Sequence, residues 1–237
     1  MELMCKKSWW VYAGLQMNLL CLLTLLSCGK GFKDDEEIQD EIGPGQYWAV
    51  LKPLNQKVGL YSGWVSLSVS DNQFWARIKV HGPNTKNMHA QYIHLNDACP
   101  DMEDDLNRDG YLDFREAHHI AGPILVPLDS NLNSQLKGLN DFPKMKMKNT
   151  FYYYSEACNS SRMLSDLKQE DTYDDMMSKL GRYEKLNFTK RVIIIYGTSE
   201  DRFLPASVSS FEVYPSQASI PIACGEIIEG QSEEINL

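Results

Sequence analysis

Alternating apolar and polar residues predict a chain built mainly of short β-strands. From residue 46 onward, apolar residues recur at every second position, which is the period of a strand with one buried face. Segment 60–69 is apolar at alternate positions from Val65, and 74–80 alternates in the same way after a turn at 71–72. These two segments predict a β-hairpin.

The rest of the chain contains further strand-like segments. They are 47–54, 89–94, 124–128, 150–154, 191–196, 207–214 and 220–228. Segment 191–196 is the richest in β-branched residues and is expected to be a central strand. Many short strands with long connections are typical of an antiparallel sandwich, so the predicted fold class is an all-β, Greek-key β-sandwich over residues 47–230.

One segment departs from the strand period. Between 161 and 180, Tyr173, Met176, Met177 and Leu180 recur at helical spacing, and Gly181 ends the run. We interpret this segment as a short helical excursion between strands, with the methionines serving in packing.

Residues 105–116 carry the most specific motif. They have the sequence D-L-N-R-D-G-Y-L-D-F-R-E and match the calcium-loop pattern D-x-[DN]-x-[DN]-G-x₅-E at every fixed position. The motif predicts one Ca²⁺ site, in which Tyr111 contributes its carbonyl and the other ligands contribute side-chain oxygens, Asp113 either directly or through a water. The predicted ligands are Asp105, Asn107, Asp109, Tyr111, Asp113 and Glu116.

The residues around this motif predict a solitary loop. Gly110 lies at the sharp turn, and Leu112 is expected to pin the loop to a core. Pro100 and Pro123 leave room for only about one helical turn on each side, so we expect an EF-hand-like loop inserted in another fold. An unpaired extracellular loop should bind calcium at about 10⁻⁴ to 10⁻³ M. The alternative is an acidic surface turn that binds nothing.

The N-terminus has the features of a targeting segment. Lys6 and Lys7 precede a mostly apolar run over 9–26, and the following L-L-S-C-G resembles the lipobox of bacterial lipoproteins. The resemblance implies a signal peptide at 1–27, lipid on Cys28, and a bacterial cell-envelope location, with Gly29 favouring the outer membrane. A transmembrane anchor is the alternative, because the apolar run is long enough to span a bilayer.

The charge of the chain limits the kinds of molecule that the protein is expected to bind. An acidic tether is expected at 28–46 and a short tail at 231–237, on either side of the sandwich. The net charge of −9 argues against nucleic-acid binding, which needs a basic surface. The expected partners are a lipid bilayer, through Cys28, and an unidentified envelope protein.

All five histidines lie between 81 and 119, which suggests a transition-metal site. His89 and His94 are five residues apart, however, so on one strand they point to opposite faces. Tyr92 is expected on the same face as His94.

Three segments resemble a known family. Residues 89–94 with Cys99-Pro100, residues 191–197, and the segment I-A-C-G-E-I at 222–227 resemble strands of copper/zinc superoxide dismutase-like sandwiches. The first segment also resembles bacterial chordin-type (CHRD) domains. The resemblance implies a superoxide dismutase-like or immunoglobulin-like sandwich, in which the calcium loop is an insertion.

Departures from that family bear on activity. Tyr92 and Tyr196 stand where the resemblance implies copper-binding histidines, and His94 alone is kept. Copper chemistry should then be lost, because imidazoles are the ligands that suit copper, and the two tyrosines are expected to pack together.

Of the six cysteines, Cys5 and Cys21 leave with the signal and Cys28 is expected to carry lipid. The remaining cysteines 99, 158 and 224 allow three single pairings. The resemblance favours a Cys99–Cys224 disulfide. Cys158 would then be buried and free, or paired to a partner.

The sequence therefore predicts a non-enzymatic, calcium-binding, lipid-anchored module of the cell envelope. One alternative is a superoxide dismutase-like copper/zinc metalloprotein that uses the clustered histidines. Another is an adhesion factor that uses Tyr152, Tyr153 and Tyr154, although core packing of alternate rings is the simpler role for strand tyrosines.

Overall fold

The structure is a computed structural model that describes residues 45–70, 72–83, 88–132, 142, 151–168, 180, 185–211 and 214–230. All of these residues belong to one compact unit spanning 40–237. The predicted signal peptide, Cys28, the tether as far as 44 and the tail from 231 lie outside the described residues.

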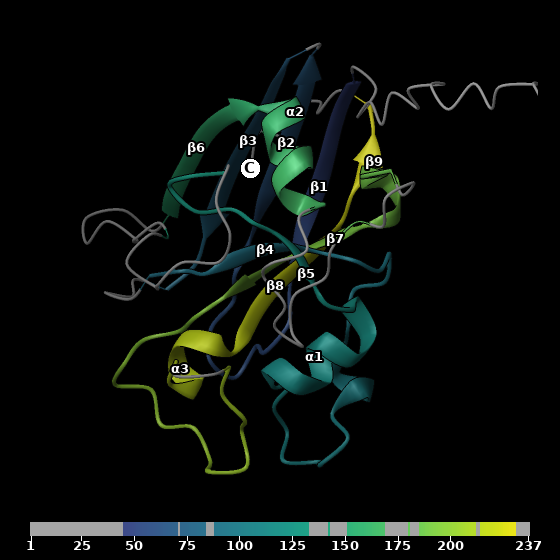
Figure 1. The fold of residues 1–237 in the computed structure, drawn as a ribbon. Helices are drawn as coiled ribbons and strands as arrows, with labels where there is room; N and C mark the ends of the chain where they lie inside the picture. Colours follow the sequence, from purple (N-terminus) through teal and green to yellow (C-terminus); the bar gives the residue numbers. More distant parts are fainter. Residues whose placement is uncertain are drawn as a thin grey trace, which may run out of the picture. The chain divides into compact units, whose positions relative to one another are not determined.

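Antiparallel strands dominate this unit, as predicted (Figure 1). The strands are β1 (Gly45–Pro53), β2 (Ser62–Ser70), β3 (Gln73–His81), β4 (Gln91–His94), β5 (Ile124–Pro127), β6 (Phe151–Asn159), β7 (Val192–Tyr196), β8 (Pro221–Glu226) and β9 (Ile228–Glu229). The helices are α1 (Phe114–Ala121), α2 (Ser160–Leu167) and α3 (Ser216–Ser219), with 3₁₀ turns η1 (Met102–Asp104) and η3 (Phe188–Lys190). The order across the sheet is β5-β4-β7-β8-β1-β2-β3-β6, and β9 pairs with β1.

The predicted hairpin is confirmed in β2 and β3. Ser70 pairs with Gln73 beside the turn, and the register continues to Ser62 opposite His81. Every second residue of both strands is buried, because a period of two places alternate side chains on one face.

Strand β1 joins the two halves of the sheet. Residues 45–51 pair with β2, whereas Lys52 and Pro53 pair with β8. The sheet therefore curls at β1 instead of running flat, as Figure 1 shows. Tyr152 and Tyr154 of β6 donate hydrogen bonds to Gln91 Oε1 (3.2 Å) and to Asp129 O (2.8 Å), which ties β6 to the opposite end of the strand order.

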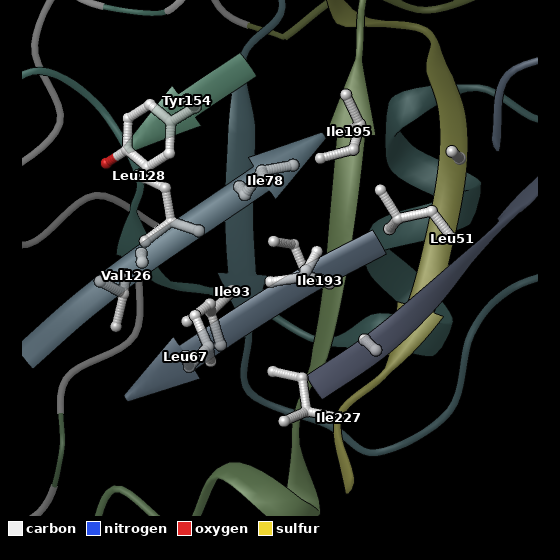
Figure 2. Close-up of a cluster of buried hydrophobic side chains, with 14 of the residues drawn as sticks. Leu51, Leu67, Ile78, Ile93, Val126, Leu128, Tyr154, Ile193, Ile195 and Ile227 are labelled. Atoms are coloured by element: carbon white, nitrogen blue, oxygen red, sulfur yellow. The ribbon is translucent and has the colours of Figure 1, made fainter. Parts of the chain in front are cut away.

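The main core lies between the two halves of the curled sheet. Strands β1, β2, β3 and β6 contribute residues such as Leu67 and Ile78, and β4, β5 and β7 contribute residues such as Ile93 and Ile193 (Figure 2). A second apolar cluster covers the other side of β4, β7 and β8. Its members include Leu112 from the calcium loop and Phe114 from α1, so the loop is packed onto the sandwich.

The predicted Cys99–Cys224 disulfide is present. It joins the segment after β4 to β8 across a separation of 125 residues. Cys158 is free and buried, and its thiol lies 3.8 Å from the sulfur of Met163. Burial raises the pKa of the Cys158 thiol to about 12, so this cysteine is an inert core residue.

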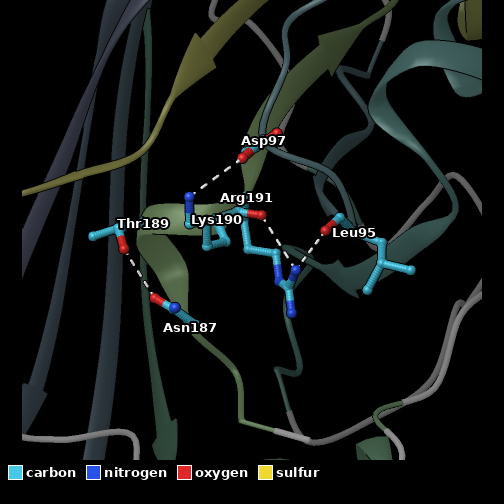
Figure 3. Close-up of polar contacts among 6 residues, drawn as sticks. All are labelled: Leu95, Asp97, Asn187, Thr189, Lys190 and Arg191. Carbon is cyan, nitrogen blue, oxygen red and sulfur yellow. Dashed lines mark hydrogen bonds and ion pairs between the residues drawn. The ribbon is translucent and has the colours of Figure 1, made fainter.

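Polar contacts fix the start of β7 against the segment after β4 (Figure 3). Arg191 Nη1 donates to Leu95 O at 2.5 Å, and Lys190 Nζ lies 3.7 Å from Asp97 Oδ2. Both side chains of the Lys190–Asp97 pair are well exposed, so the ion pair adds little stability and the Arg191 contact is the stronger connection.

One predicted strand is wrong. Residues 207–211 form no strand, and the short helix α3 follows at 216. Local turns replace the expected ladder: Val208 N donates to Pro205 O, and Tyr214 N donates to Phe211 O. Phe211 instead packs face to face on Phe114, with ring centroids 4.3 Å apart.

The predicted helical excursion is confirmed at its start, where α2 is capped by Asn159. Most of the remaining predicted helix, residues 169–179, lies outside the described residues. Within the described part of the chain, no helix is long and apolar enough to cross a membrane.

Candidate metal centre

The predicted calcium loop lies between η1 and α1, and α1 is labelled at the lower right of Figure 1. The single turn of η1 agrees with the expectation of a short preceding helix. Helix α1 has eight residues and is longer than the single turn expected, because Asp113 caps it and Gly122 ends it with a φ of 75°.

Side-chain oxygens organise the first half of the loop by accepting backbone N–H groups. Asp105 accepts from the amides of Asp109 (3.3 Å) and Gly110 (2.8 Å). Asn107 accepts from Asp109, and Asp109 accepts from Tyr111, both at 2.8 Å. The loop is therefore wound around its own acidic side chains.

The backbone shows why the motif requires its glycine. Gly110 has a φ of 82°, a left-handed conformation that costs a residue without Cβ very little. A Cβ at this position would also meet the Lys57 ammonium at 2.1 Å. Arg108 has a φ of 58° as well, so two left-handed residues make the sharp turn.

Asp109 provides the observation that best fits a cation. Its Oδ1 accepts a hydrogen bond, whereas its Oδ2 is buried and has no hydrogen-bond partner among the described residues. A buried carboxylate oxygen is costly unless a proton or a cation compensates it. An acidic oxygen set of this kind suits a hard ion such as Ca²⁺.

Glu116 connects the end of the loop to its beginning. Its side chain is only 7% exposed, and its Oε1 accepts from the amides of Leu106 (2.9 Å) and Asn107 (3.2 Å). Its Oε2 accepts from Asp113 N at 2.9 Å. The last predicted ligand therefore contacts the backbone at the beginning of the loop, at Leu106 and Asn107.

Asp113 has a different position from the other acidic residues. Its Oδ1 accepts from the amides of Arg115 and Glu116, and its Oδ2 accepts from both the amide and the hydroxyl of Ser209. Four hydrogen bonds occupy the four acceptor positions of a carboxylate. Asp113 therefore caps α1 and holds the 199–211 segment through its hydrogen bonds with Ser209. Its role as a calcium ligand stays a prediction.

The carboxylates are brought onto one loop but do not converge on one point. Among the described residues, no group of three or more His, Cys, Asp and Glu side chains is arranged to hold a metal ion. Calcium coordination would thus require Asp105, Asp109 and Glu116 to turn from backbone amides toward a common centre.

Asn55 is the residue that sequence reasoning missed. Its side chain is 2% exposed and pairs with both backbone groups of Leu112, accepting from the amide (2.8 Å) and donating to the carbonyl (2.7 Å). It also donates to Pro221 O at 2.8 Å, beside β8. No local pattern distinguishes Asn55, because its partners are 57 and 166 residues away.

The residues of the family resemblance form a separate buried network. His94 Nδ1 lies 2.8 Å from Gly122 O, and its Nε2 lies 3.0 Å from the Tyr196 hydroxyl. A carbonyl only accepts, so Nδ1 carries the proton and Nε2 accepts from Tyr196. The rings of Tyr92 and Tyr196 are 5.5 Å apart, which confirms that the two tyrosines pack together.

His89 and His94 face opposite sides, as predicted. His89 stacks on Tyr152 at 5.0 Å, away from the Tyr92–Tyr196 pair, and its Nδ1 lies 3.0 Å from Tyr196 O. Burial is the main cause that lowers the pKa of each imidazole to about 4, so both histidines are neutral near pH 7.

Sequence comparison with known proteins does not assign this chain to a family. No model of a known protein family matches the chain, and no curated protein matches its sequence.

Proposed function

We propose that this protein is a calcium-binding, non-enzymatic module of the bacterial cell envelope, anchored by lipid on Cys28. The calcium loop is the basis of the proposal. All fixed positions of the motif are present, two left-handed residues form its turn, and a buried oxygen of Asp109 has no hydrogen-bond partner among the described residues.

The buried tyrosines favour a binding module over a copper enzyme. The Tyr196 hydroxyl donates a hydrogen bond to His94 Nε2, and the rings of Tyr92 and Tyr196 pack beside the His94 imidazole. A copper ion bound by His94 would have to displace that hydrogen bond and gain ligands other than imidazole.

Calcium should stabilise the folded protein. At a calcium concentration ten times Kd, the gain is about 1.4 kcal/mol, which corresponds to a rise in Tm of about 3–6 °C. Thermal melts of the full chain in excess calcium and in chelator measure this shift. Glu116→Gln should remove most of it, because the substitution replaces a charged bidentate ligand with a neutral amide.

Glu103→Gln is the matched control. Glu103 is exposed and lies just before the loop, so its substitution should leave the calcium shift unchanged. Equal melting of wild type and Glu116→Gln in both buffers would mean that the loop is an acidic turn.

The lipid anchor has its own test. Wild-type protein should partition into detergent and carry lipid at Cys28, and Cys28→Ala should do neither. Mass spectrometry that finds Cys28 unmodified in the mature protein would refute the anchor.

A further inference from the structure

The tryptophans among the described residues all lie on the outer surface of β1, β2, β3 and β6. The sequence has five tryptophans: Trp9 and Trp10 lie in the predicted signal, and the other three are Trp48, Trp64 and Trp75. Each of these three has at least one strand neighbour buried in the main core: Ala49 beside Trp48, Val65 beside Trp64, and Phe74 and Ala76 beside Trp75. Side chains alternate between the faces of a strand, so the three rings lie on the side away from that core.

We call this surface the tryptophan face. It comprises the even-numbered residues of 46–50 and 62–70, the odd-numbered residues of 73–81 and 151–159, and Ile228, which pairs with Trp48. Tyr153 and Ile228 are 53% and 46% exposed, and the three tryptophans are partly exposed. The face therefore presents aromatic rings to solvent.

Strand register fixes how these rings are spaced. Trp64, Lys79 and Tyr153 are successive partners across β2, β3 and β6, so Trp64 and Tyr153 lie in one row about 10 Å apart. Trp48 lies one row away on β1, and Trp75 lies one further row away on β3. The rings are spread over the face and do not form one cluster.

Polar groups fill the positions between the rings. Most are hydroxyl or amide side chains: Gln46, Ser62, Ser66, Ser68, Ser70, Gln73, Ser155 and Asn159. Gln46 Nε2 donates to Ser68 Oγ at 2.9 Å, across neighbouring strands. The face can therefore both donate and accept hydrogen bonds.

The charges on this face are of one sign. Arg77 and Lys79 are at its centre, and they lie 5.1 Å and 5.2 Å from the rings of Trp75 and Phe151. None of the positions of the tryptophan face is Asp or Glu, although the chain has 32 acidic residues. In an acidic protein, this is a surface that attracts anions.

We propose that the tryptophan face binds an acidic polysaccharide. The electron-rich face of an aromatic ring attracts the weakly positive C–H groups on one side of a sugar ring. The serine, glutamine and asparagine side chains match sugar hydroxyls, and Arg77 and Lys79 match carboxylate or sulfate groups. The rings are spaced along the outer surface of the sheet, and such spacing suits an extended chain of sugars.

Single-stranded nucleic acid is the main competing ligand, since bases also stack on aromatic side chains beside basic residues. The net charge of −9 disfavours it, because nucleic-acid affinity comes largely from neutralising phosphates. The polysaccharide proposal is independent of calcium binding, since none of the loop residues belongs to this face.

The test uses the full chain with three polymers: polygalacturonate, the neutral glucan dextran and a single-stranded oligothymidylate. Chelator is present throughout, because polygalacturonate itself binds calcium. Affinity electrophoresis measures binding, and tryptophan fluorescence gives a second readout, because three of the five tryptophans lie on this face. Polygalacturonate should bind and change the fluorescence, whereas dextran and the oligonucleotide should not.

Tyr153→Ala and Arg77→Gln are the central variants, because both residues are exposed and their substitution should not unfold the protein. Each should weaken polygalacturonate binding about fivefold or more. Phe203→Ala is the matched control, since Phe203 is 81% exposed but lies outside this face, and it should bind as wild type does.

Several results would overturn the proposal. These are no binding of polygalacturonate, equal binding of dextran, tighter binding of the oligonucleotide, or wild-type affinity in both Tyr153→Ala and Arg77→Gln.

Discussion

Asn55 shows how much one buried amide can hold in place. It makes three hydrogen bonds to main-chain groups of Leu112 and Pro221 while being almost fully buried. An amide side chain carries a donor and an acceptor together, so it pairs with Leu112 as a neighbouring strand would. The calcium loop is thereby hydrogen-bonded to the sandwich at the residue that also enters the second core.

We predict that Asn55→Ala destabilises the protein by about 3 kcal/mol or more, because it leaves one buried amide and two buried carbonyls without this partner. Urea denaturation in chelator measures the loss. Gln56→Ala, at the exposed neighbouring position, should change stability by less than about 0.5 kcal/mol. Equal effects of the two substitutions would show that the Asn55 contacts contribute nothing.

The buried histidines predict a loss of stability in acid. The folded-state pKa of His89 and of His94 is about 4, below the ordinary value of 6.5, so the folded state favours the neutral form. This contribution is complete above pH 6.5 and is lost as the pH falls toward 4, since the unfolded chain takes up protons first. At pH 5 the loss is about 2 kcal/mol for each histidine.

Urea midpoints measured between pH 7.5 and pH 5 test this prediction. The free energy of unfolding of wild type should fall steeply over that range, and that of His94→Gln should fall less. His119→Gln, at an exposed position, should follow wild type. A flat wild-type profile would contradict the neutral, buried state of both imidazoles.

At the scale of elements, α1 depends on Asp113. This residue caps the helix and holds the 199–211 segment through Ser209. Asp113→Ala should cost about 2–3 kcal/mol, the sum of a lost cap and lost hydrogen bonds to Ser209. Ser209→Ala removes only the hydroxyl contact and should cost about 1 kcal/mol in chemical denaturation. A larger loss from Ser209→Ala than from Asp113→Ala would rule out the cap as the dominant contribution.

Elements defined by local patterns could be predicted from the sequence. The β2–β3 hairpin follows from its period of two, and the sharp turn of the calcium loop follows from its acidic spacing and Gly110. Segment 207–214 has similar apolar residues, but Phe211 packs on Phe114 of α1, and no strand forms in the described residues 207–211. The sequence does not reveal that tertiary contact, so the local prediction failed.

The calcium loop could likewise be predicted from the sequence only as far as its local motif defines it. The motif names the residues of the loop, but the direction in which each carboxylate points depends on distant groups. Asp113 faces Ser209, 96 residues later in the chain, and Leu112 meets Asn55. Such long-range pairs have no signature in a single sequence.

At the scale of the whole molecule, the Cys99–Cys224 disulfide closes a long loop. In the chain-entropy model, a loop of this length contributes about 4–5 kcal/mol by restricting the unfolded chain. The double variant Cys99→Ser/Cys224→Ser should lose that amount in urea denaturation. Cys158→Ser is a useful comparison, because it changes a buried thiol without opening the loop. Equal stability of wild type and the double variant would contradict the prediction.

The pairing of β1 with both β2 and β8 determines which parts of the molecule can unfold separately. Because residues 45–51 hydrogen-bond with β2 while Lys52 and Pro53 pair with β8, neither half of the sheet can open without freeing one side of the same strand. Local opening should therefore be confined to the connecting loops. The paired amides of β1, β2 and β8 should exchange hydrogen with solvent only when the whole unit unfolds, and all at one common free energy.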